Sequence, residues 1–301
     1  MKLIYHNSNN VGDFINEIIF DEIRKLPIPE SHVALGIGTI LGLKTPGENT
    51  TYHVFGAGLS SDQIDTYGTF DSSKIHQYVF HGVRGPLTAN AIDPDFPPKI
   101  SSDFAYLLPQ KIQPSQNHGC CTVGFIPHKD SLNLYDNWDW LLQLAGISFI
   151  SPLLPPQEFV NRISECSKVM CEAMHGAILC DAYGIPWIPV FTYSGVSLSK
   201  WQDWLHGIGQ KEVAFNVIRG PRNIHWKSRR FEPLLGKKFG RIFAIIIEGL
   251  LSANFLVRLK LILLLKKFQL SSREALAQIQ KNQSDTLTNF IQSWTQNEQR
   301  S

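Results

Sequence analysis

The chain has 301 residues, of which 43% are hydrophobic and 18% are charged. This composition is typical of a globular protein with a substantial core, and it excludes a disordered or low-complexity chain. The first residues run into a polar stretch without an apolar segment of signal-peptide length, so we expect a cytoplasmic protein. Five cysteines without a CxxC pair predict free, mostly buried thiols: Cys120, Cys121, Cys166, Cys171 and Cys180.

Positive charge is concentrated near the C-terminus. Residues 219–267 hold twelve Lys and Arg against two Glu, a net charge of +10, whereas the rest of the chain carries −8. This asymmetry indicates a local anionic partner, and the aromatic and apolar residues of the segment favour the inner face of an anionic membrane. A helix packed across the protein with solvated charges is the alternative. No nucleic-acid-binding module accompanies the charge, so we expect no nucleic-acid partner.

The first hundred residues alternate strand-like runs with turns and helical patterns. Strands are predicted at residues 1–6, 32–36, 52–56 and 76–80. An amphipathic helix is predicted at residues 14–26, where Pro27 and Pro29 end it. This βα alternation predicts a Rossmann-like domain over residues 1–112.

A polar, turn-rich stretch at residues 109–119 predicts an interdomain linker. Beyond it, strands are predicted at residues 121–126, 147–150, 168–171 and 187–191. A short helix is predicted from His175 to Tyr183, ended by Gly184 and Pro186. The second Rossmann-like domain is therefore expected over residues 119–222. The predicted fold class is α/β, with two doubly wound domains facing a cleft.

Residues 223–301 are expected to form a basic and apolar helical extension. Residues 241–265 are strongly apolar, but Glu248, Asn254, Arg258 and Lys260 interrupt them, so we expect no membrane span. Ser271-Ser272-Arg273-Glu274 is a capping-box pattern that predicts a docked or partly ordered final helix.

Several familiar catalytic patterns are missing from the sequence, including the Walker A loop, HExxH and GxSxG. Gly36-Ile37-Gly38 lacks the third glycine of the dinucleotide fingerprint, which argues against NAD binding. Asp93-Pro94-Asp95 has the spacing of a metal-binding pair, but its proline-rich surroundings favour a solvated loop. We therefore expect neither a metal nor a cofactor.

Glycine-bearing loops follow the apolar runs of the first domain. They contain Gly12, Gly36 and Gly38, Gly56 and Gly58, and Gly85. Small residues let a ligand approach the backbone, and helices that start after such loops direct free N–H groups toward it, which favours anions. For any single loop, an ordinary strand-to-helix turn is the alternative.

Four motifs occur in a characteristic order. They are Asn10-Val11-Gly12-Asp13, His81-Gly82-Val83-Arg84-Gly85-Pro86-Leu87-Thr88, Phe125-Ile126-Pro127-His128 and Glu172-Ala173-Met174-His175-Gly176-Ala177-Ile178. Together they resemble the polysaccharide pyruvyl transferases, in the branch of the xanthan ketal pyruvate and succinoglycan enzymes, over about residues 1–220. The resemblance implies a GT-B-like enzyme that transfers the carbon skeleton of phosphoenolpyruvate onto two sugar hydroxyls as a cyclic ketal, with release of phosphate.

The resemblance also suggests roles for individual residues. His175 is the candidate proton donor or phosphate ligand, and Asp13 is expected to orient or deprotonate an acceptor hydroxyl. Arg84 is the expected planar donor fork for the anionic donor, and His128 a second phosphate ligand. Backbone contacts to the donor are expected at Gly12, Gly36, Gly38, Gly56, Gly58, Gly85 and Gly176. The arginine that many relatives carry two residues before the histidine is Ala173 here.

The implied substrates are phosphoenolpyruvate and a sugar of an exopolysaccharide or its lipid-linked precursor. Two other functions stay open for this sequence. One is a GT-B-type glycosyltransferase with a nucleotide-sugar donor, and the other is a non-catalytic sugar-binding relative. For each candidate residue, a cap or another structural role is the alternative.

Overall fold

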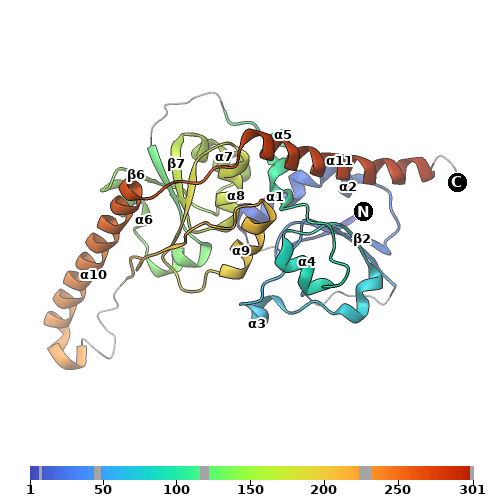
Figure 1. Cartoon of the computed structure of the whole chain (residues 1–301). Coiled ribbons are helices and arrows are strands. Elements are labelled where there is room, and N and C mark those ends of the chain that lie inside the picture. The colour runs from blue at the N-terminus through green and yellow to red at the C-terminus, as the bar shows by residue number, and fades with distance from the viewer. Residues whose placement is uncertain (7–8, 44–48, 116–121, 224–231, 299–301) are drawn as a thin grey trace.

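Two parallel β-sheets, one from each half of the chain, form the body of the protein (Figure 1). The computed structural model describes residues 1–6, 9–43, 49–115, 122–223 and 232–298. Cys120, Cys121 and most of the second half of the predicted linker lie outside the described residues. The other three cysteines are buried free thiols.

The first sheet contains four parallel strands in the order β1-β2-β3-β4. They are β1 (Lys2–Ile4), β2 (His32–Leu35), β3 (Thr51–Phe55) and β4 (Tyr78–Gly82). All four overlap the predicted strands, although β4 starts later because a 3₁₀ turn, η1 (Ser72–Gln77), precedes it. Side chains alternate between the two faces, so Val33 and Leu35 of β2 enter one hydrophobic cluster and Ala34 enters another.

Short helices connect and cover these strands. They are α1 (Val11–Ile19), α2 (Asp21–Lys25), α3 (Ile64–Tyr67), α4 (Pro86–Ile92), the 3₁₀ turn η2 (Phe104–Leu107) and α5 (Leu108–Lys111). The single helix predicted at residues 14–26 is two helices that meet at Phe20. Helix α1 begins earlier than predicted because the Asn10 side chain accepts a hydrogen bond from the Asp13 N–H and caps it.

The second sheet contains five parallel strands in the order β6-β5-β7-β8-β9. They are β5 (Thr122–Ile126), β6 (Ile147–Phe149), β7 (Cys166–Cys171), β8 (Trp187–Phe191) and β9 (Asn216–Val217). Its connections contain the 3₁₀ turn η3 (Lys129–Leu134) and the helices α6 (Trp138–Gln143), α7 (Pro156–Ser164), α8 (Met174–Ala182) and α9 (Leu198–Gly207). The chain leaves β5 toward β6 on one side and continues with β7 on the other, which is the reversal of a doubly wound sheet.

The predicted α/β class with parallel sheets is confirmed, but the two sheets differ in winding. Only the second has the reversal, since the described strands of the first sheet follow one another in a single direction. The expectation of two doubly wound sheets is therefore met by one of them. The GT-B arrangement and the domain boundaries at residues 112, 119 and 222 stay predictions.

One hydrophobic cluster joins the two halves of the chain. It contains Phe20 and Phe104 from the first half together with Val169, Ile178 and Trp204 from the second. Helix α1 contacts α7 and α8, and η2 contacts α8. The two sheets are thus held by shared apolar packing, and their relative placement is set by the core.

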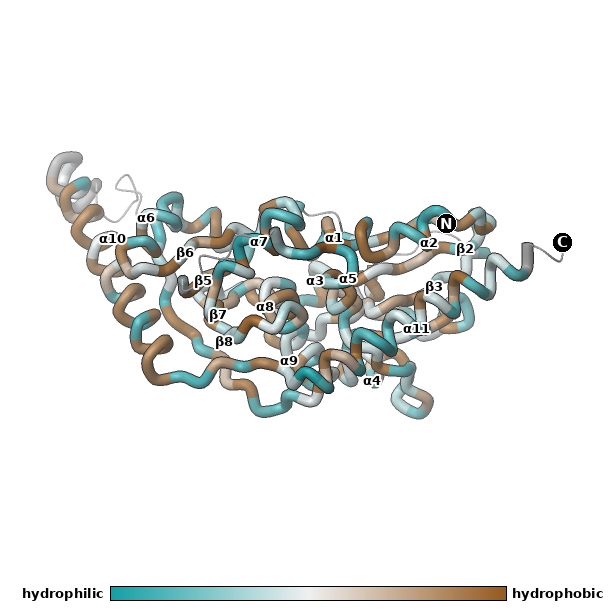
Figure 2. Tube along the Cα trace, turned by 90° about the horizontal axis from the view of Figure 1, so that it is seen from above, coloured by the Kyte–Doolittle hydropathy of each residue, from teal (hydrophilic) through white to brown (hydrophobic). Residues whose placement is uncertain are grey.

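Two long helices complete the chain, α10 (Glu232–Leu265), with a break at Gly236, and α11 (Arg273–Glu298). Helix α10 packs on the second sheet through Phe255, Leu259 and Ile262. Helix α11 returns to the first sheet, so the two helices extend toward opposite ends of the molecule (Figures 1 and 2). The prediction of a docked final helix is confirmed by the buried residues Gln283 and Phe290.

The apolar part of α10 is longer than its charged residues suggested. Residues 239–265 form one helix that is long and apolar enough to cross a membrane by length and composition. The polar residues therefore do not exclude a span by composition, and the expectation of no membrane span stays a prediction. However, Phe255 and Leu259 on its inner face are completely buried against the protein, which ties this part of α10 to the second sheet.

Three histidines form a ladder across the first sheet beneath α11. His32 Nδ1 lies 3.0 Å from His53 Nε2, and His53 Nδ1 lies 3.1 Å from His81 Nε2. Phe290 of α11 packs against His53 and His81. Burial lowers the pKa of both His53 and His81 to about 4, and for His53 the neighbouring histidines add to this effect. His53 and His81 therefore stay neutral in the folded protein above a pH of about 4.

This ladder makes stability depend on pH. Because the folded pKa values of about 4 lie below the usual 6.5, the unfolded chain binds more protons between these values. We expect the free energy of unfolding to fall as the pH drops from 6.5 toward 4, and to fall less in the double variant His53→Gln/His81→Gln. Urea unfolding at pH 7 and pH 5 measures the difference. The exposed His76→Gln serves as control, and equal losses in wild type and the double variant would contradict the expectation.

Candidate functional site

A cavity of about 360 Å³ lies where the carboxyl ends of strands from both sheets meet. Gly38 and Thr39 follow β2, His128 follows β5, and Ala173 to His175 follow β7, and all of them line it. Ligands of parallel α/β sheets bind outside the carboxyl ends of the strands, at the point where the strand order reverses. In the second sheet that point lies between β5 and β7, so His128 and His175 flank it.

His175 lies in the first turn of α8, against the start of α1. A Cβ atom at Gly12 would come within 2.0 Å of His175 Nδ1, so the absence of a side chain there makes room for the imidazole. Helix α8 has Ala173 at its N-cap, without a side-chain cap. Its first N–H groups therefore lack the usual partner at the cavity wall, and the positive end of the helix dipole favours an anion there.

Asp13 comes to the same cavity from α1. Its side chain is buried, lines the cavity and accepts a hydrogen bond from the Asn10 amide at 2.9 Å. The structure thus brings Asp13, His128 and His175 together around one space. Their spatial grouping agrees with what the motifs suggested, while their roles stay predictions.

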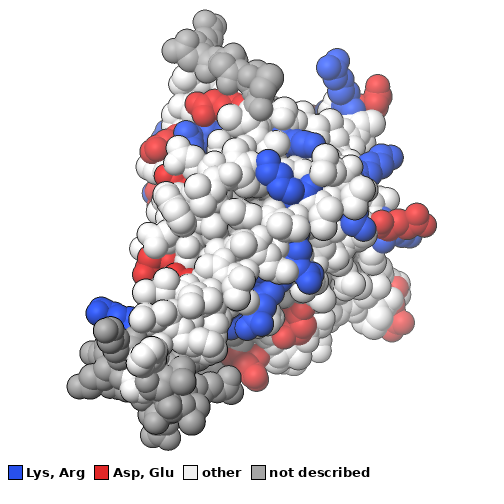
Figure 3. Space-filling model, turned by 90° about the vertical axis from the view of Figure 1, so that its left-hand side faces the viewer, with Lys and Arg blue, Asp and Glu red and all other residues white. Residues whose placement is uncertain are grey.

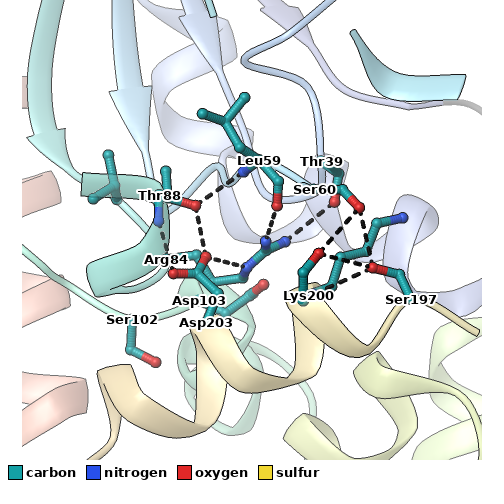
Figure 4. Close-up of polar contacts among 12 residues, drawn as sticks. Thr39, Leu59, Ser60, Arg84, Thr88, Ser102, Asp103, Ser197, Lys200 and Asp203 are labelled. Carbon is teal, nitrogen blue, oxygen red and sulfur yellow. Dashed lines mark hydrogen bonds and ion pairs between the residues drawn. The ribbon is translucent and has the colours of Figure 1, made fainter. Parts of the chain in front are cut away.

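Arg84 is placed differently from the expectation. Its side chain is 0% exposed and forms an ion pair with Asp203 of α9 at 3.0 Å. The guanidinium also donates to Thr39 Oγ1 at 3.2 Å and to the Leu59 carbonyl (Figure 4). To bind a ligand directly, the guanidinium needs N–H groups that face the cavity. The N–H groups of Arg84 that form these contacts already have acceptors within the protein. Arg84 reaches the cavity only through Thr39.

Further polar contacts join α9 to α4 and to the loop after β3. Thr88 Oγ1 and the Thr88 N–H both donate to Asp203 (Figure 4). Asp62 accepts hydrogen bonds from Ser197 and Ser199. Burial alone would raise the pKa of Asp62, but these hydrogen bonds outweigh it and hold the pKa at about 2. Helix α9 is thereby attached to the first half of the protein.

Lys200 is a cavity residue that the sequence did not reveal. It follows Ser197 and Ser199 on α9, and its Nζ lies 3.4 Å from the centre of the Tyr67 ring. No described carboxylate lies within ion-pair distance of its Nζ. Burial lowers the pKa of Lys200 to about 7, and the positive charges of Arg84 and Lys129 contribute to this shift. Asp62 and Asp13 act in the opposite direction and favour the charged amine, so Lys200 is suited to an anionic ligand.

His128 is held at the cavity rim by backbone and side-chain contacts. Its N–H donates to Glu172 at 2.8 Å, and its Nδ1 accepts from the Asp130 N–H. Glu172 is completely buried and also accepts from the backbone of Thr192 and Tyr193, so one carboxylate ties together the loops after β5, β7 and β8. Burial lowers the pKa of His128 and raises that of Glu172.

Comparisons with known proteins bear on what this cavity does. The family model of the polysaccharide pyruvyl transferases matches residues 4–195. The chain belongs to this family. It is 28% identical over 248 residues to succinoglycan biosynthesis protein ExoV of Rhizobium meliloti, covering 79% of this chain and 72% of that protein. It also resembles the crystal structure of an uncharacterised Klebsiella pneumoniae protein, with a TM-score of 0.42 and 13% identity over 73% of this chain and 93% of that one.

The family match makes this protein a transferase. The seven glycines at which we expected backbone contacts to the donor differ in their surroundings in this pyruvyl transferase. Gly38 has a φ of 120° and lines the cavity, and Gly12 makes room for His175. The others lie against protein atoms, with their closest neighbours in Asn16 for Gly36, Phe104 for Gly56, Arg84 for Gly58, Asp203 for Gly85 and Ile126 for Gly176. Most of the glycine-bearing loops thus serve close packing at the strand ends.

The position before Met174, where the resemblance implies an arginine, also faces the cavity in this pyruvyl transferase. Ala173 lines the cavity and offers no charge, while Lys200 brings a cation into the same cavity from α9. Among the described residues, no group of three or more His, Cys, Asp and Glu side chains is placed to hold a metal ion. The basic side chains that line the cavity belong to Lys and His residues.

The lowered pKa of Lys200 predicts pH-dependent anion binding. Sulfate stays a dianion between pH 6 and 8, whereas an amine with a pKa of about 7 loses most of its charge over this range. We expect the dissociation constant for sulfate to rise about tenfold from pH 6 to pH 8 through Lys200 alone. Isothermal titration of wild type and Lys200→Arg separates this effect from the histidines, because Arg stays charged. An identical pH dependence in both proteins would exclude Lys200.

Proposed function

We propose that this protein transfers the pyruvyl group of phosphoenolpyruvate onto two hydroxyls of a sugar in an exopolysaccharide or its lipid-linked precursor. The family match and the relative named for succinoglycan biosynthesis support this reaction class. The observation that carries the proposal for this chain is the cavity itself. It gathers His175, Lys200, the uncapped start of α8 and the carboxylate of Asp13 around one space.

The donor carries a phosphate and a carboxylate, and the cavity offers complementary groups. We assign the phosphate to the first N–H groups of α8 together with Lys200 and His128, since charge-assisted hydrogen bonds contribute about 1.5–3 kcal/mol each. Arg84 acts from behind the cavity wall, where it orients Thr39 and fixes α9. Thr39 and the backbone near Gly38 line another part of the cavity, to which we assign the donor carboxylate.

The chemistry starts with protonation of the donor. His175 donates a proton to the methylene carbon of the enol, which makes the central carbon electrophilic. A sugar hydroxyl adds to this carbon and gives its proton to Asp13. Phosphate then leaves, and the second hydroxyl attacks the same carbon to close the ketal ring and gives its proton back to His175. The reaction requires no cofactor, because bond cleavage in phosphoenolpyruvate drives it.

The role of His175 can be tested by removing it. We expect phosphate release from phosphoenolpyruvate in the presence of acceptor to fall about 100-fold or more in His175→Ala, because general acid catalysis typically contributes this much. The matched control is His76→Ala, an exposed histidine outside the cavity. Near wild-type turnover in His175→Ala would remove this residue from the mechanism.

The choice of donor distinguishes this function from sugar transfer in a similar cleft. A donor that binds the folded protein raises its melting temperature, so phosphoenolpyruvate should stabilise the protein and nucleoside diphosphates should not. Stabilisation by a nucleoside diphosphate alone would support a glycosyltransferase. The absence of any turnover despite acceptor binding would support a non-catalytic relative.

We also propose that α10 seats the enzyme on the inner face of an anionic membrane, where a lipid-linked acceptor is presented. Large apolar side chains are exposed along α10, namely Phe239, Ile242, Phe243, Ile245, Ile246, Leu250, Val257, Leu261, Leu264 and Leu265. On this side of the molecule, Lys and Arg side chains lie within a broad uncharged surface, and α10 extends beyond the body (Figures 2 and 3). Its buried inner face favours a helix lying along the membrane.

Vesicle flotation tests this surface. We expect the protein to float with vesicles of anionic phospholipid at low salt and to bind less to neutral vesicles or at high salt. The double variant Ile246→Glu/Leu250→Glu should lose binding, because it places charges on the exposed apolar face. Phe96→Glu is the control, since Phe96 is also an exposed apolar residue but lies outside α10. Binding that is equal in all three proteins would contradict the assignment.

A further inference from the structure

Asp103 is a buried carboxylate that none of the motifs identified. It precedes η2 and is completely buried, and its Oδ1 accepts a hydrogen bond from the Ala105 N–H at 2.9 Å. Its second oxygen, Oδ2, has no hydrogen-bond partner among the described residues. A buried carboxylate oxygen without a hydrogen-bond partner is destabilising, because the lost hydration is not replaced. A hydrogen-bond donor close to Oδ2 removes this penalty.

The donor that faces it belongs to the candidate catalytic residue. Asp103 Oδ2 lies 3.5 Å from His175 Nε2. This nitrogen is also buried and also lacks a hydrogen-bond partner in the described part of the chain. Two polar atoms without hydrogen-bond partners thus face one another across the junction of the two halves. A small rotation of the imidazole brings them into a hydrogen bond, with Nε2–H as donor and Asp103 Oδ2 as acceptor.

This contact decides which ring nitrogen is free to react. With its proton on Nε2 held by Asp103, His175 keeps Nδ1 for exchange with a ligand. Nδ1 lies beside Gly12, at the start of α1, where Val11 and Asp13 line the cavity. The side chain of His175 is 17% exposed, and its buried Nε2 contributes nothing to that exposure.

Helix α11 holds the backbone on which Asp103 sits. The completely buried Gln283 amide donates to the Ser101 carbonyl at 2.8 Å and to the Asp103 carbonyl at 2.9 Å. Between them, Ser102 has a φ of 61°, a left-handed conformation that costs energy in a residue other than glycine. The two hydrogen bonds from Gln283 flank this strained residue and stabilise it.

We propose that Asp103 is a positioning residue that fixes the Nε2–H tautomer of His175, and that Gln283 of α11 holds Asp103 in place for this purpose. The consequence for catalysis rests on the proposed function of His175. The proton transferred to the donor methylene carbon then leaves from Nδ1, while the carboxylate of Asp103 faces Nε2 and stabilises the imidazolium. Helix α11, which lies beyond the family match at residues 4–195, thereby becomes part of the catalytic apparatus.

The variant Asp103→Asn tests the tautomer directly. Asn keeps an oxygen for the Ala105 N–H, so the cap of η2 is retained. Its NH₂ group then faces His175 Nε2, which must accept, and the proton moves to Nδ1. We expect ¹⁵N NMR of labelled histidine, assigned with His175→Gln, to show the Nε2–H form in wild type and the Nδ1–H form in Asp103→Asn. The same tautomer in both proteins would overturn the proposal.

Kinetics separate this positioning role from the proposed reaction. We expect kcat of pyruvyl transfer to fall about tenfold or more in Asp103→Asn, with a smaller change in KM for phosphoenolpyruvate, because the ring is present but presents the wrong nitrogen. If the tautomer changes as expected but wild type transfers no pyruvyl group, the proposed function fails and the positioning role stands. If wild type is active and the tautomer does not change, the positioning role alone fails.

The contribution of α11 is tested with two glutamines of the same helix. Gln283→Met removes the hydrogen bonds to the backbone at Asp103, whereas Gln280→Met removes the hydrogen bond to the Tyr106 carbonyl at 3.0 Å and leaves Asp103 untouched. We expect a mixed His175 tautomer and a lower kcat only in Gln283→Met, at similar melting temperatures. Equal spectra and equal kcat in the two variants would overturn the role of Gln283.

Discussion

The buried ion pair between Arg84 and Asp203 constrains the rest of the molecule. Two opposite charges at 0% and 1% exposure are tolerated only if their hydrogen-bonding capacity is largely met inside the protein. Thr39, Leu59 and Thr88 meet it, and all three belong to the first half of the chain (Figure 4). Helix α9 is therefore fixed to the first sheet although it follows β8 of the second.

The cavity is a consequence of this arrangement. Because α9 is held in place, Lys200 enters the space where strand ends of both sheets meet, and the start of α8 lines the same space. Buried carboxylates then hold the histidines, since Glu172 binds the backbone of His128 and Asp103 faces His175. The anionic donor that we propose would meet cations and helix N–H groups here, while Glu172 and Asp103 do not line the cavity.

Much of the architecture could be predicted from periodicity, because strand and helix patterns are local. The strands at residues 187–191 and 122–126 are examples, and the clustering of Asp13, His128 and His175 followed from motifs placed after strands. Arg84 shows the limit. Its residue type and its glycine-rich surroundings suit a ligand, but its burial depends on Asp203, which lies 119 positions away in the chain. Lys200 and Asp103 stand in no recognised motif, so nothing local pointed to them.

The amino-acid sequence alone determined the α/β class, the family-specific motifs and the basic, apolar C-terminal segment, because each depends on residues that are close together in the chain. Only the tertiary structure decided which charged groups face the cavity and which are neutralised inside the protein. It also showed that the final helix reaches the segment containing Asp103, about 180 residues earlier. The burial and pairing of charged groups depend on residues that are distant in the chain and meet only on folding. Local sequence patterns therefore do not predict them.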